Sequence, residues 1–373
     1  MARKQKSALE VMQGVEQPGQ INTDAVKTLH ARKRVTHTVQ ELVEGIFAGN
    51  RTLLSKAITL VESSLAEHQE MAQEVIALCL KRLNIEYRST IFEVRTRGIR
   101  IGITGVPGVG KSTFIEALGK YLTGKGHKLA VLAIDPSSSR SKGSILGDKT
   151  RMEELAVDPN AFIRPSPAAG SLGGVARKTR ETIILCEAAG FDVIFIETVG
   201  VGQSETTVHS MVDFFLLLML AGAGDELQGI KRGIIEMADA IVINKADGDN
   251  LDKAKAARVE YAHALHLFPP PEGGWTPLAD ICSARTKMGI ENVWQIILKH
   301  REITTASGFF EQRRMEQNRQ VLRESIEEGL KQHFFSQKEI GSVIAGIEQG
   351  SVDGNLNPYK AAQDLLDQYF RKF

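Results

Sequence analysis

The amino-acid sequence predicts an α/β fold with a mostly parallel, doubly wound sheet, flanked by N-terminal and C-terminal helical regions. Between residues 98 and 305, short apolar segments alternate with helical segments, which is typical of strands joined by helices. Most of the apolar segments are continuous runs of Val, Ile, Leu and Phe, as expected for strands covered on both faces. Outside this range, apolar residues recur every three or four positions, which indicates amphipathic helices.

The chain is expected to have four parts. Residues 1–38 are polar and basic and resemble a flexible leader, whereas residues 39–97 have the apolar spacing of an N-terminal helical region. Residues 98–305 carry the sheet pattern, and residues 306–373 form a C-terminal helical arm. The predicted strands lie at 99–104, 129–134, 161–164, 193–197, 214–220, 240–244 and 278–282. The predicted helices from the sheet region onward lie near 112–123, 173–189, 228–238, 251–267, 288–301, 310–334, 337–349 and 357–372.

The overall composition argues against several classes of protein. Lys and Arg number 46 against 45 Asp and Glu, so the formal net charge of +1 does not favour a general nucleic-acid or membrane-surface binder. The apolar run at 214–221 is too short to span a bilayer, and the N-terminus lacks the apolar core of a secretory signal. The three cysteines have no paired spacing. We therefore expect a cytoplasmic protein without nucleic-acid or membrane partners, with the mitochondrial matrix as the alternative location.

A phosphate-binding loop is the clearest motif. Residues 105–112 match G-x-x-x-x-G-K-[ST], and they lie between a predicted strand and a predicted helix. Glycines allow the backbone N–H groups to surround a phosphate, and the helix N-terminus adds positive partial charge. Lys111 is expected to reach the β- and γ-phosphates, and the Ser112 hydroxyl to bind Mg²⁺. The motif predicts a P-loop NTPase whose phosphate-binding residues are Gly105, Pro107, Gly108, Val109, Gly110, Lys111, Ser112 and Thr113.

A second motif predicts that the base is guanine. Asn244-Lys245-Ala-Asp247 follows a predicted strand, and the Asp247 carboxylate is suited to accept both the N1–H and the 2-amino donors of guanine. Adenine has no such donor pair. The aliphatic stem of Lys245 can lie along the ring, and Ser283-Ala284 follows the last strand where a backbone N–H can contact guanine O6. The expected ligands are therefore GTP and GDP.

A third motif predicts a nucleotide-responsive segment. Glu197-Thr-Val-Gly200 resembles the D-x-x-G switch with Glu in place of Asp, so the carboxylate would hold Mg²⁺ and the Gly200 N–H would sense the γ-phosphate. Val201 stands where Ras-like switches carry a water-orienting Gln, and Gln203 is offset by two positions. We therefore expect slow intrinsic hydrolysis that depends on a partner or on another loop.

Two further acidic residues are candidates for the Mg²⁺ site beside Ser112 and Glu197. Asp135 ends a predicted strand, and Asp148 opens a predicted helix that runs to Leu155. Both carboxylates are suited to complete the shell of the ion. For Asp148, a simple N-cap is an equal alternative.

The complete set of motifs resembles the MeaB/ArgK/MMAA family of P-loop GTPases, which are chaperones of methylmalonyl-CoA mutase. The resemblance covers roughly residues 40–370. The motifs that carry it lie at 135–138, 146–152, 164–167, 172–174, 197–204, 224–231 and 244–247.

The resemblance implies a GTPase that chaperones an adenosylcobalamin-dependent acyl-CoA mutase. Such proteins gate the loading of the cofactor from an adenosyltransferase and favour removal of damaged cobalamin. Residues 222–233 look like the third switch of the family, in which Lys231 is expected to bring charge to the transition state, and the family commonly forms homodimers through its C-terminal arm. The family pattern implies a phosphate and Mg²⁺ site of Lys111, Ser112, Asp135, Asp148 and Glu197 and a guanine site of Asn244, Asp247, Ser283 and Ala284.

Three other functions stay open at the level of the sequence. His263 and His266 have the spacing of a metal pair, which a nickel metallochaperone GTPase would need, but no third ligand accompanies them. A small-molecule phosphotransferase would need an acceptor site, and a signal-recognition-type GTPase would need a Met-rich domain; neither is recognisable. Within the mutase hypothesis, methylmalonyl-CoA mutase is the default partner, and isobutyryl- and ethylmalonyl-CoA mutases are alternatives.

Overall fold

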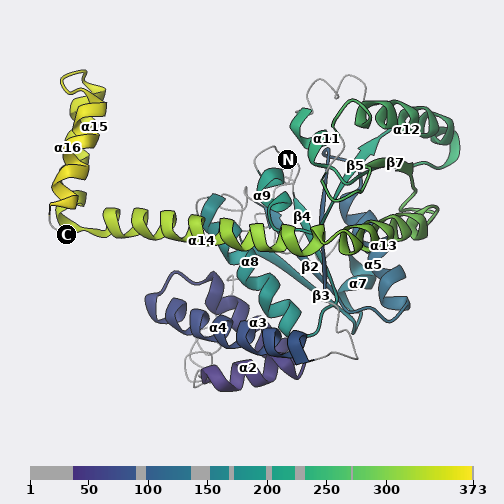
Figure 1. The fold of residues 1–373 in the computed structure, drawn as a ribbon, viewed down its shortest axis with the longest axis horizontal. Coiled ribbons are helices and arrows are strands. Elements are labelled where there is room, and N and C mark those ends of the chain that lie inside the picture. The colour runs from purple at the N-terminus through teal and green to yellow at the C-terminus, as the bar shows by residue number, and fades with distance from the viewer. Residues whose placement is uncertain are drawn as a thin grey trace, which may run out of the picture. The chain divides into compact units, whose positions relative to one another are not determined.

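The computed structural model contains one sheet of seven parallel strands in the order β3-β2-β4-β1-β5-β6-β7 (Figure 1). Its helices cover both faces, so the predicted α/β, doubly wound P-loop fold is confirmed. The structure describes residues 37–89, 98–135, 152–167, 172–198, 204–222, 232–269 and 272–371. The strands are β1 (Ile99–Gly105), β2 (Leu129–Asp135), β3 (Ala161–Pro167), β4 (Val193–Thr198), β5 (Phe214–Leu220), β6 (Ala240–Asn244) and β7 (Leu278–Ile281).

The helices follow the predicted order along the chain, except that α9 was not predicted. A 3₁₀ turn, η1 (Gly248–Asn250), precedes α12. They are α2 (Val39–Phe47), α3 (Arg51–Glu62), α4 (Ala66–Ser89), α5 (Lys111–Gly124), α7 (Glu153–Ala156), α8 (Leu172–Ala188), α9 (Ser204–His209), α11 (Arg232–Met237), α12 (Leu251–Leu265), α13 (Ile290–Ala306), α14 (Phe309–Ser336), α15 (Lys338–Val352) and α16 (Pro358–Phe370). None of the helices in the described part of the chain combines the length and hydropathy that a membrane crossing needs.

One predicted helix differs from the structure. The sequence pattern places its start at Asp148, but α7 begins at Glu153, and Met152 has a non-helical φ of −126°. Met152 and Leu155 are both buried and have the spacing of a helical face, yet Met152 precedes the helix and is not part of it. Asp148 itself lies outside the described residues.

Side chains alternate between the two faces of the sheet, so each face has its own core. Ile101, Phe195 and Phe214 pack with residues of α5 and α13 on one face. Ile194 and Phe215 point to the other face, where α8 and α9 cover the sheet. Because both faces are apolar, polar side chains at the ends of the strands are the ones available for a binding site.

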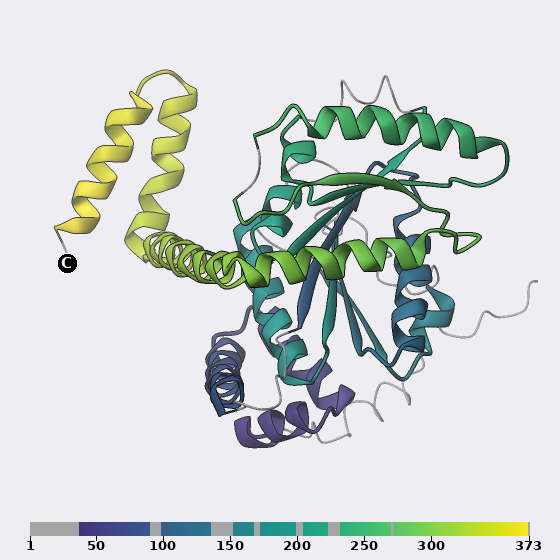
Figure 2. The same cartoon turned by 45° about the vertical axis from the view of Figure 1, so that its right-hand side comes forward.

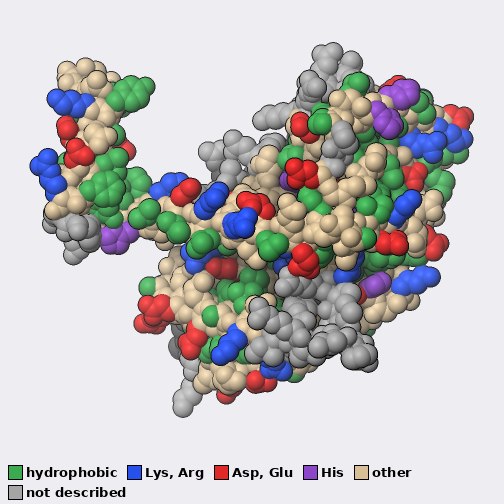
Figure 3. All heavy atoms as spheres, in the orientation of Figure 1, with side chains coloured by type: hydrophobic (Ala, Val, Ile, Leu, Met, Phe, Trp, Pro, Cys, Tyr) green, Lys and Arg blue, Asp and Glu red, His purple; other side chains and the backbone are tan. Residues whose placement is uncertain are grey.

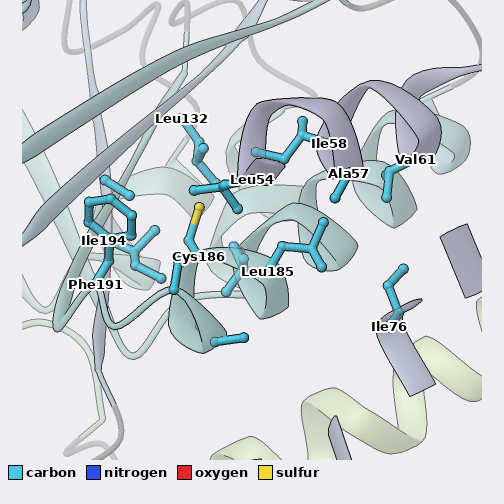
Figure 4. Packing of buried hydrophobic residues seen from close by; sticks show 14 of the residues in the cluster. Leu54, Ala57, Ile58, Val61, Ile76, Leu132, Leu185, Cys186, Phe191 and Ile194 are labelled. Atoms are coloured by element: carbon cyan, nitrogen blue, oxygen red, sulfur yellow. The ribbon is translucent and has the colours of Figure 1, made fainter. Parts of the chain in front are cut away.

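The N-terminal helices α2, α3 and α4 share the core of the sheet through α8. Leu54 and Ile58 of α3 lie in one cluster with Cys186 of α8 and with Leu132 and Ile194 of the sheet (Figure 4). The N-terminal helical region is therefore built onto the face of the sheet. The predicted divisions at residues 38, 97 and 305 stay a proposal.

The C-terminal arm begins with α14, a helix of 28 residues that crosses α8 (Figure 1). Its length is about 42 Å at 1.5 Å per residue. Beyond it, α15 and α16 lie side by side as a hairpin (Figure 2). Gly308, with a left-handed φ of 76°, makes the turn from α13 into α14.

Two adjacent arginines fix the first turns of α14 to the amino ends of the strands. Arg314 makes a two-fold ion pair with Asp213, with Nε–Oδ1 and Nη2–Oδ2 distances of 2.8 and 2.6 Å, and also donates to Gly98 O at 2.6 Å. Both side chains of this pair are buried. Arg313 lies 3.6 Å from Asp239, which precedes β6. Although burial raises the pKa of Asp213, the charge and hydrogen bonds of Arg314 hold it below its usual range.

Candidate functional site

The predicted motifs meet at one edge of the sheet. In a parallel sheet all carboxyl ends lie at the same edge, where ligands of open α/β folds bind. The phosphate loop follows β1, Glu197 lies near the end of β4, and Asn244 ends β6. Asp135 ends β2 beside β4, although only its backbone is described.

The phosphate loop has the backbone of an anion-binding turn. Gly108 and Gly110 have left-handed φ values of 79° and 90°, which side chains other than glycine rarely adopt. Gly105 lies so close to β5 that a Cβ there would be 2.4 Å from Leu218 O. Gly110 is the N-cap of α5, so the loop ends at a helix N-terminus with free N–H groups.

Lys111 folds back over the loop. Its Nζ donates to Gly105 O at 2.9 Å and to Val106 O at 3.5 Å, so the ammonium is held where the loop surrounds a phosphate. Burial lowers the pKa of Lys111 below its ordinary value, and the carboxylates of Glu197 and Glu205 oppose this shift. The two acidic side chains thus compensate for part of the cost of burying the ammonium.

Ser112 and Glu197 are brought together, as the sequence predicts for a cation site. Ser112 Oγ lies 3.5 Å from Glu197 Oε1, and Glu197 is nearly buried at the end of β4. A hydroxyl and a carboxylate oxygen side by side are the hard ligands that Mg²⁺ prefers.

Asn244 ties the phosphate loop to the loop after β7. This side chain is buried; its Nδ2 donates to Val109 O at 2.9 Å, and its Oδ1 accepts from Ala284 N at 3.1 Å. The Ala284 amide that we expect at guanine O6 therefore donates to Asn244 in this structure, and its contact with the base stays a prediction. Asn244 acts on the site by holding two loops in register.

Asp247 is held by the second half of the same loop. Ser283 Oγ donates to Asp247 Oδ2, and the Ser283 hydroxyl also accepts from Thr286 N at 3.1 Å. Ser283 is fully buried, so the carboxylate has a fixed partner. Because an ionised carboxylate offers about four lone-pair sites, Asp247 can accept from Ser283 and from the two donors of guanine at once.

Lys245 also spans the two motifs. Its Nζ donates to Gly108 O at 2.7 Å, and its backbone has a left-handed φ of 59°, which is uncommon for a residue with a side chain. Strained backbone of this kind is typical of binding sites. The long apolar stem of Lys245 runs from the base motif to the phosphate loop, and its predicted contact with the guanine ring stays a prediction.

Part of the predicted site cannot be placed. Asp148, Gly200 and Lys231 lie outside the described residues, as does the side chain of Asp135. Pro107 and Thr113 are exposed on the phosphate loop and in the first turn of α5. The roles of all of these residues stay predictions.

Sequence reasoning missed Glu205. It lies in the first turn of α9, is buried, and its charge acts on Lys111. The signal for it was its position just after the 197–204 motif, on a segment with few apolar residues. Among the described residues, no group of three His, Cys, Asp or Glu side chains is arranged to hold a metal ion, and this includes His263 and His266.

Comparisons with known proteins agree with this geometry. A family model described as methylmalonyl-CoA mutase-associated GTPase MeaB matches residues 54–339. A Caulobacter vibrioides protein, described by name as a GTPase, is 49% identical over 328 residues, which are 88% of this chain and 96% of that protein. The mitochondrial methylmalonic aciduria type A homolog of Mus musculus is 46% identical over 337 residues, 89% of this chain and 79% of that protein.

A solved structure extends the likeness to three dimensions. The crystal structure of an LAO/AO transport system kinase has a TM-score of 0.68 with 36% identity, and the match covers 90% of this chain and 99% of that one. The family resemblance expected from the motifs is confirmed. The chain is a P-loop GTPase that binds guanine nucleotides, and it belongs to the MeaB family of methylmalonyl-CoA mutase-associated GTPases.

Proposed function

We propose that this GTPase is a chaperone of an adenosylcobalamin-dependent acyl-CoA mutase, with methylmalonyl-CoA mutase as the first candidate. It would use GTP to gate the loading of the cofactor, which an adenosyltransferase would deliver, and to protect the assembled mutase. The observation that carries the proposal is the extent of the family match. It runs from Leu54 to residue 339, so it includes most of α3, all of α4 and α14 as well as the nucleotide site.

The nucleotide site supports a mechanism in which the chain orients GTP and responds to its γ-phosphate. Lys111 would exchange its bond to Gly105 O for phosphate oxygens, and Asp247 would select guanine. Gly200 would sense the γ-phosphate, and Lys231 would add positive charge at the transition state. Since Val201 stands where Ras-like switches carry a water-orienting Gln, hydrolysis is expected to be slow until a partner completes the site.

The donor set at the phosphate edge fits Mg²⁺. Ser112 and Glu197 would hold the ion, since their oxygens already lie 3.5 Å apart, and Asp135 and Asp148 are further candidates. When bound, Mg²⁺ neutralises charge on the β- and γ-phosphates. Glu197 therefore has to stay ionised, which is consistent with its position beside Lys111.

The C-terminal arm is the proposed dimer surface. Hydrophobic side chains gather over its hairpin (Figure 3), where Tyr359, Phe370 and Phe335 are 86, 65 and 61% exposed. An exposed apolar surface of this kind is typical of protein interfaces. We expect a homodimer in the cytoplasm, with the mitochondrial matrix as the alternative location.

The test is GTP hydrolysis with and without purified methylmalonyl-CoA mutase. We expect the mutase to accelerate hydrolysis and to change the affinity for GTP, because the partner completes the catalytic site. An unrelated acyl-CoA enzyme that uses no cobalamin serves as the control partner. If the mutase changes neither rate nor affinity, while the isolated chain still hydrolyses GTP, the chaperone proposal is wrong and the GTPase assignment stands.

A further inference from the structure

The short helix α9 starts at the nucleotide site. It directly follows the segment that contains Glu197 and Gly200, and Glu205 in its first turn is buried beside the charge of Lys111. Val208 seats the helix on β1: a Cβ at Gly102 would lie 2.9 Å from Val208 Cγ1. Because no space separates α9 from the strand that carries the phosphate loop, α9 follows any movement at that edge as a rigid piece.

The other end of α9 contacts the arm directly. Arg313 of α14 donates from Nη2 to His209 Nε2 at 3.1 Å. A guanidinium can only donate, so His209 is the acceptor and carries its proton on Nδ1. Burial, followed by the charge of Arg313, lowers the pKa of His209 to about 4, while Asp239 opposes the shift. His209 is therefore a neutral acceptor at neutral pH, and the link is intact.

A second link runs through α8. Ser210 follows α9, and its Oγ accepts from Arg180 Nη2 at 2.8 Å. The other end of the same guanidinium, Nη1, pairs with Glu324, three turns along α14 from Arg313. The C-terminal end of α9 is thus joined to α14 at two points on the same helix.

The arm has room to respond on one side. A cavity of about 520 Å³ lies among α4, α8 and α14, and Gln317, Asn318, Val321 and Ser325 of α14 line it. A close-packed interface resists displacement, whereas a helix beside an open cavity can tilt about its anchored end. The anchored end here is the first turn, where Arg314 holds Asp213.

We propose that α9 couples the bound nucleotide to the orientation of α14, with the links His209–Arg313 and Ser210–Arg180–Glu324 transmitting the change. The inference goes beyond the proposed chaperone function, because it needs only GTP binding and no partner. Coupling is reciprocal: if the nucleotide moves α14, then cutting the links alters the relative affinity for GTP and GDP.

The test measures amide hydrogen exchange in the full chain with GDP and with a non-hydrolysable GTP analogue. In the unmodified protein, exchange over residues 309–325 should differ between the two nucleotides. The double variant His209→Phe/Ser210→Ala removes both acceptors, while the Phe ring still packs against Phe215, whose ring centroid lies 5.5 Å from that of His209. In this double variant, the nucleotide-dependent difference in amide exchange should disappear over α14. The corresponding difference at residues 105–113 should remain.

Affinity provides an independent readout. The ratio of the dissociation constants for the GTP analogue and GDP should change about fivefold in the double variant, the lower end of typical coupling. The single variant His209→Gln places an amide oxygen near the Nε2 position, so Arg313 keeps an acceptor. Its ratio of dissociation constants should equal that of the unmodified protein. Arg319→Gln, which removes an exposed arginine of α14, is the matched control and should have no effect.

Two results overturn the inference: α14 exchange that is the same with both nucleotides, or a nucleotide difference that persists in the double variant. If the double variant does not melt cooperatively, Glu324→Ala is used instead, since that side chain is 40% exposed and its removal takes away the acceptor of Arg180 Nη1, which cuts only the outer link. This single variant should reduce the nucleotide-dependent difference in amide exchange over α14. An unchanged difference counts against the proposal.

Discussion

At the scale of single residues, the nucleotide site depends on side chains that hold one another. Asn244 joins the phosphate loop to the 282–284 loop, Lys245 joins it to Gly108, and Ser283 holds Asp247. The sequence predicts which residues belong to the site because each motif has a characteristic spacing. It does not reveal these mutual contacts, since they depend on how close the ends of β1, β6 and β7 lie in space.

Replacement of Asp247 by Asn should change the base that is bound. The variant loses the carboxylate that accepts the two guanine donors, and charge-assisted hydrogen bonds of this kind contribute about 1.5–3 kcal/mol, so GTP affinity should fall by a factor of about 10 to 150. An Asn side-chain amide can donate to the 2-oxo group of xanthine, so xanthosine triphosphate should bind better than it does to the unmodified protein.

The measurement is a titration of both triphosphates by fluorescence or calorimetry. Asp249→Asn, two residues further on in the 3₁₀ turn η1, is the control and should leave both affinities unchanged. Equal loss of both nucleotides in D247N would mean that Asp247 has a structural role only.

His209 should make the stability of the protein depend on pH. Its pKa is about 4 in the folded chain against 6.5 for an ordinary histidine, so the unfolded chain binds the proton more readily. The free energy of unfolding therefore falls as the pH drops from 6.5 towards 4, and is unaffected by this group above 6.5. The charged groups that face His209 are Arg313 and Asp239.

In His209→Gln this contribution is absent. Between pH 7 and pH 5, the loss of unfolding free energy measured by urea titration should be smaller by about 2 kcal/mol than in the unmodified protein. His263→Gln, which changes a histidine on the surface helix α12, is the matched control. Identical pH profiles for H209Q and the unmodified chain would contradict the assignment.

At the scale of elements, strands and long helices were predictable because their patterns are local. All seven strands are found where the sequence predicts them, and most of them are continuous apolar runs because burial on both faces leaves no polar alternation. The predicted helix was wrong at Met152, whose φ of −126° is non-helical, because its burial three residues before Leu155 mimics helical spacing. The role of α9 could not be predicted, because it depends on Gly102 and Val208, which are far apart in the sequence.

The seat of α9 on β1 can be tested with Gly102→Ala. The added methyl group would lie 2.9 Å from Val208 Cγ1 and from Phe215 Cδ2, so the helix must shift. Overpacking of this kind should lower the free energy of unfolding by about 1–3 kcal/mol. Gly124→Ala at the end of α5 is the control, because a Cβ there meets nothing within 4 Å. Equal stability of the two variants would show that α9 is not tightly seated.

At the scale of the whole molecule, the arm carries an exposed apolar stripe that does not pack against the sheet domain. Leu322, Ile326 and Leu330 are 62, 53 and 58% exposed and follow one another at intervals of four residues, so they share a face of α14. The sequence predicts the helix, but its weak amphipathic pattern does not show which face stays uncovered. Only the packing of the other face on α8 and α13 identifies it.

The double variant Ile326→Glu/Leu330→Glu should weaken the proposed homodimer. Two buried carboxylates in an apolar interface cost several kcal/mol, so sedimentation velocity should show a shift from dimer to monomer at micromolar concentration. The variant should still hydrolyse GTP, because the stripe is remote from the phosphate loop. Gln332→Glu, which adds charge to another face of α14, is the control. A dimer that persists in the double variant would place the interface elsewhere.

The ion pair between Arg314 and Asp213 makes the root of the arm inseparable from the rest of the fold. A chain cut after α13 would leave the Asp213 carboxylate buried without its guanidinium, a loss of the kind that costs about 3–5 kcal/mol. Truncation of the arm should therefore preserve the fold only when the cut lies beyond this pair, and changes at the tip of the arm leave the pair intact.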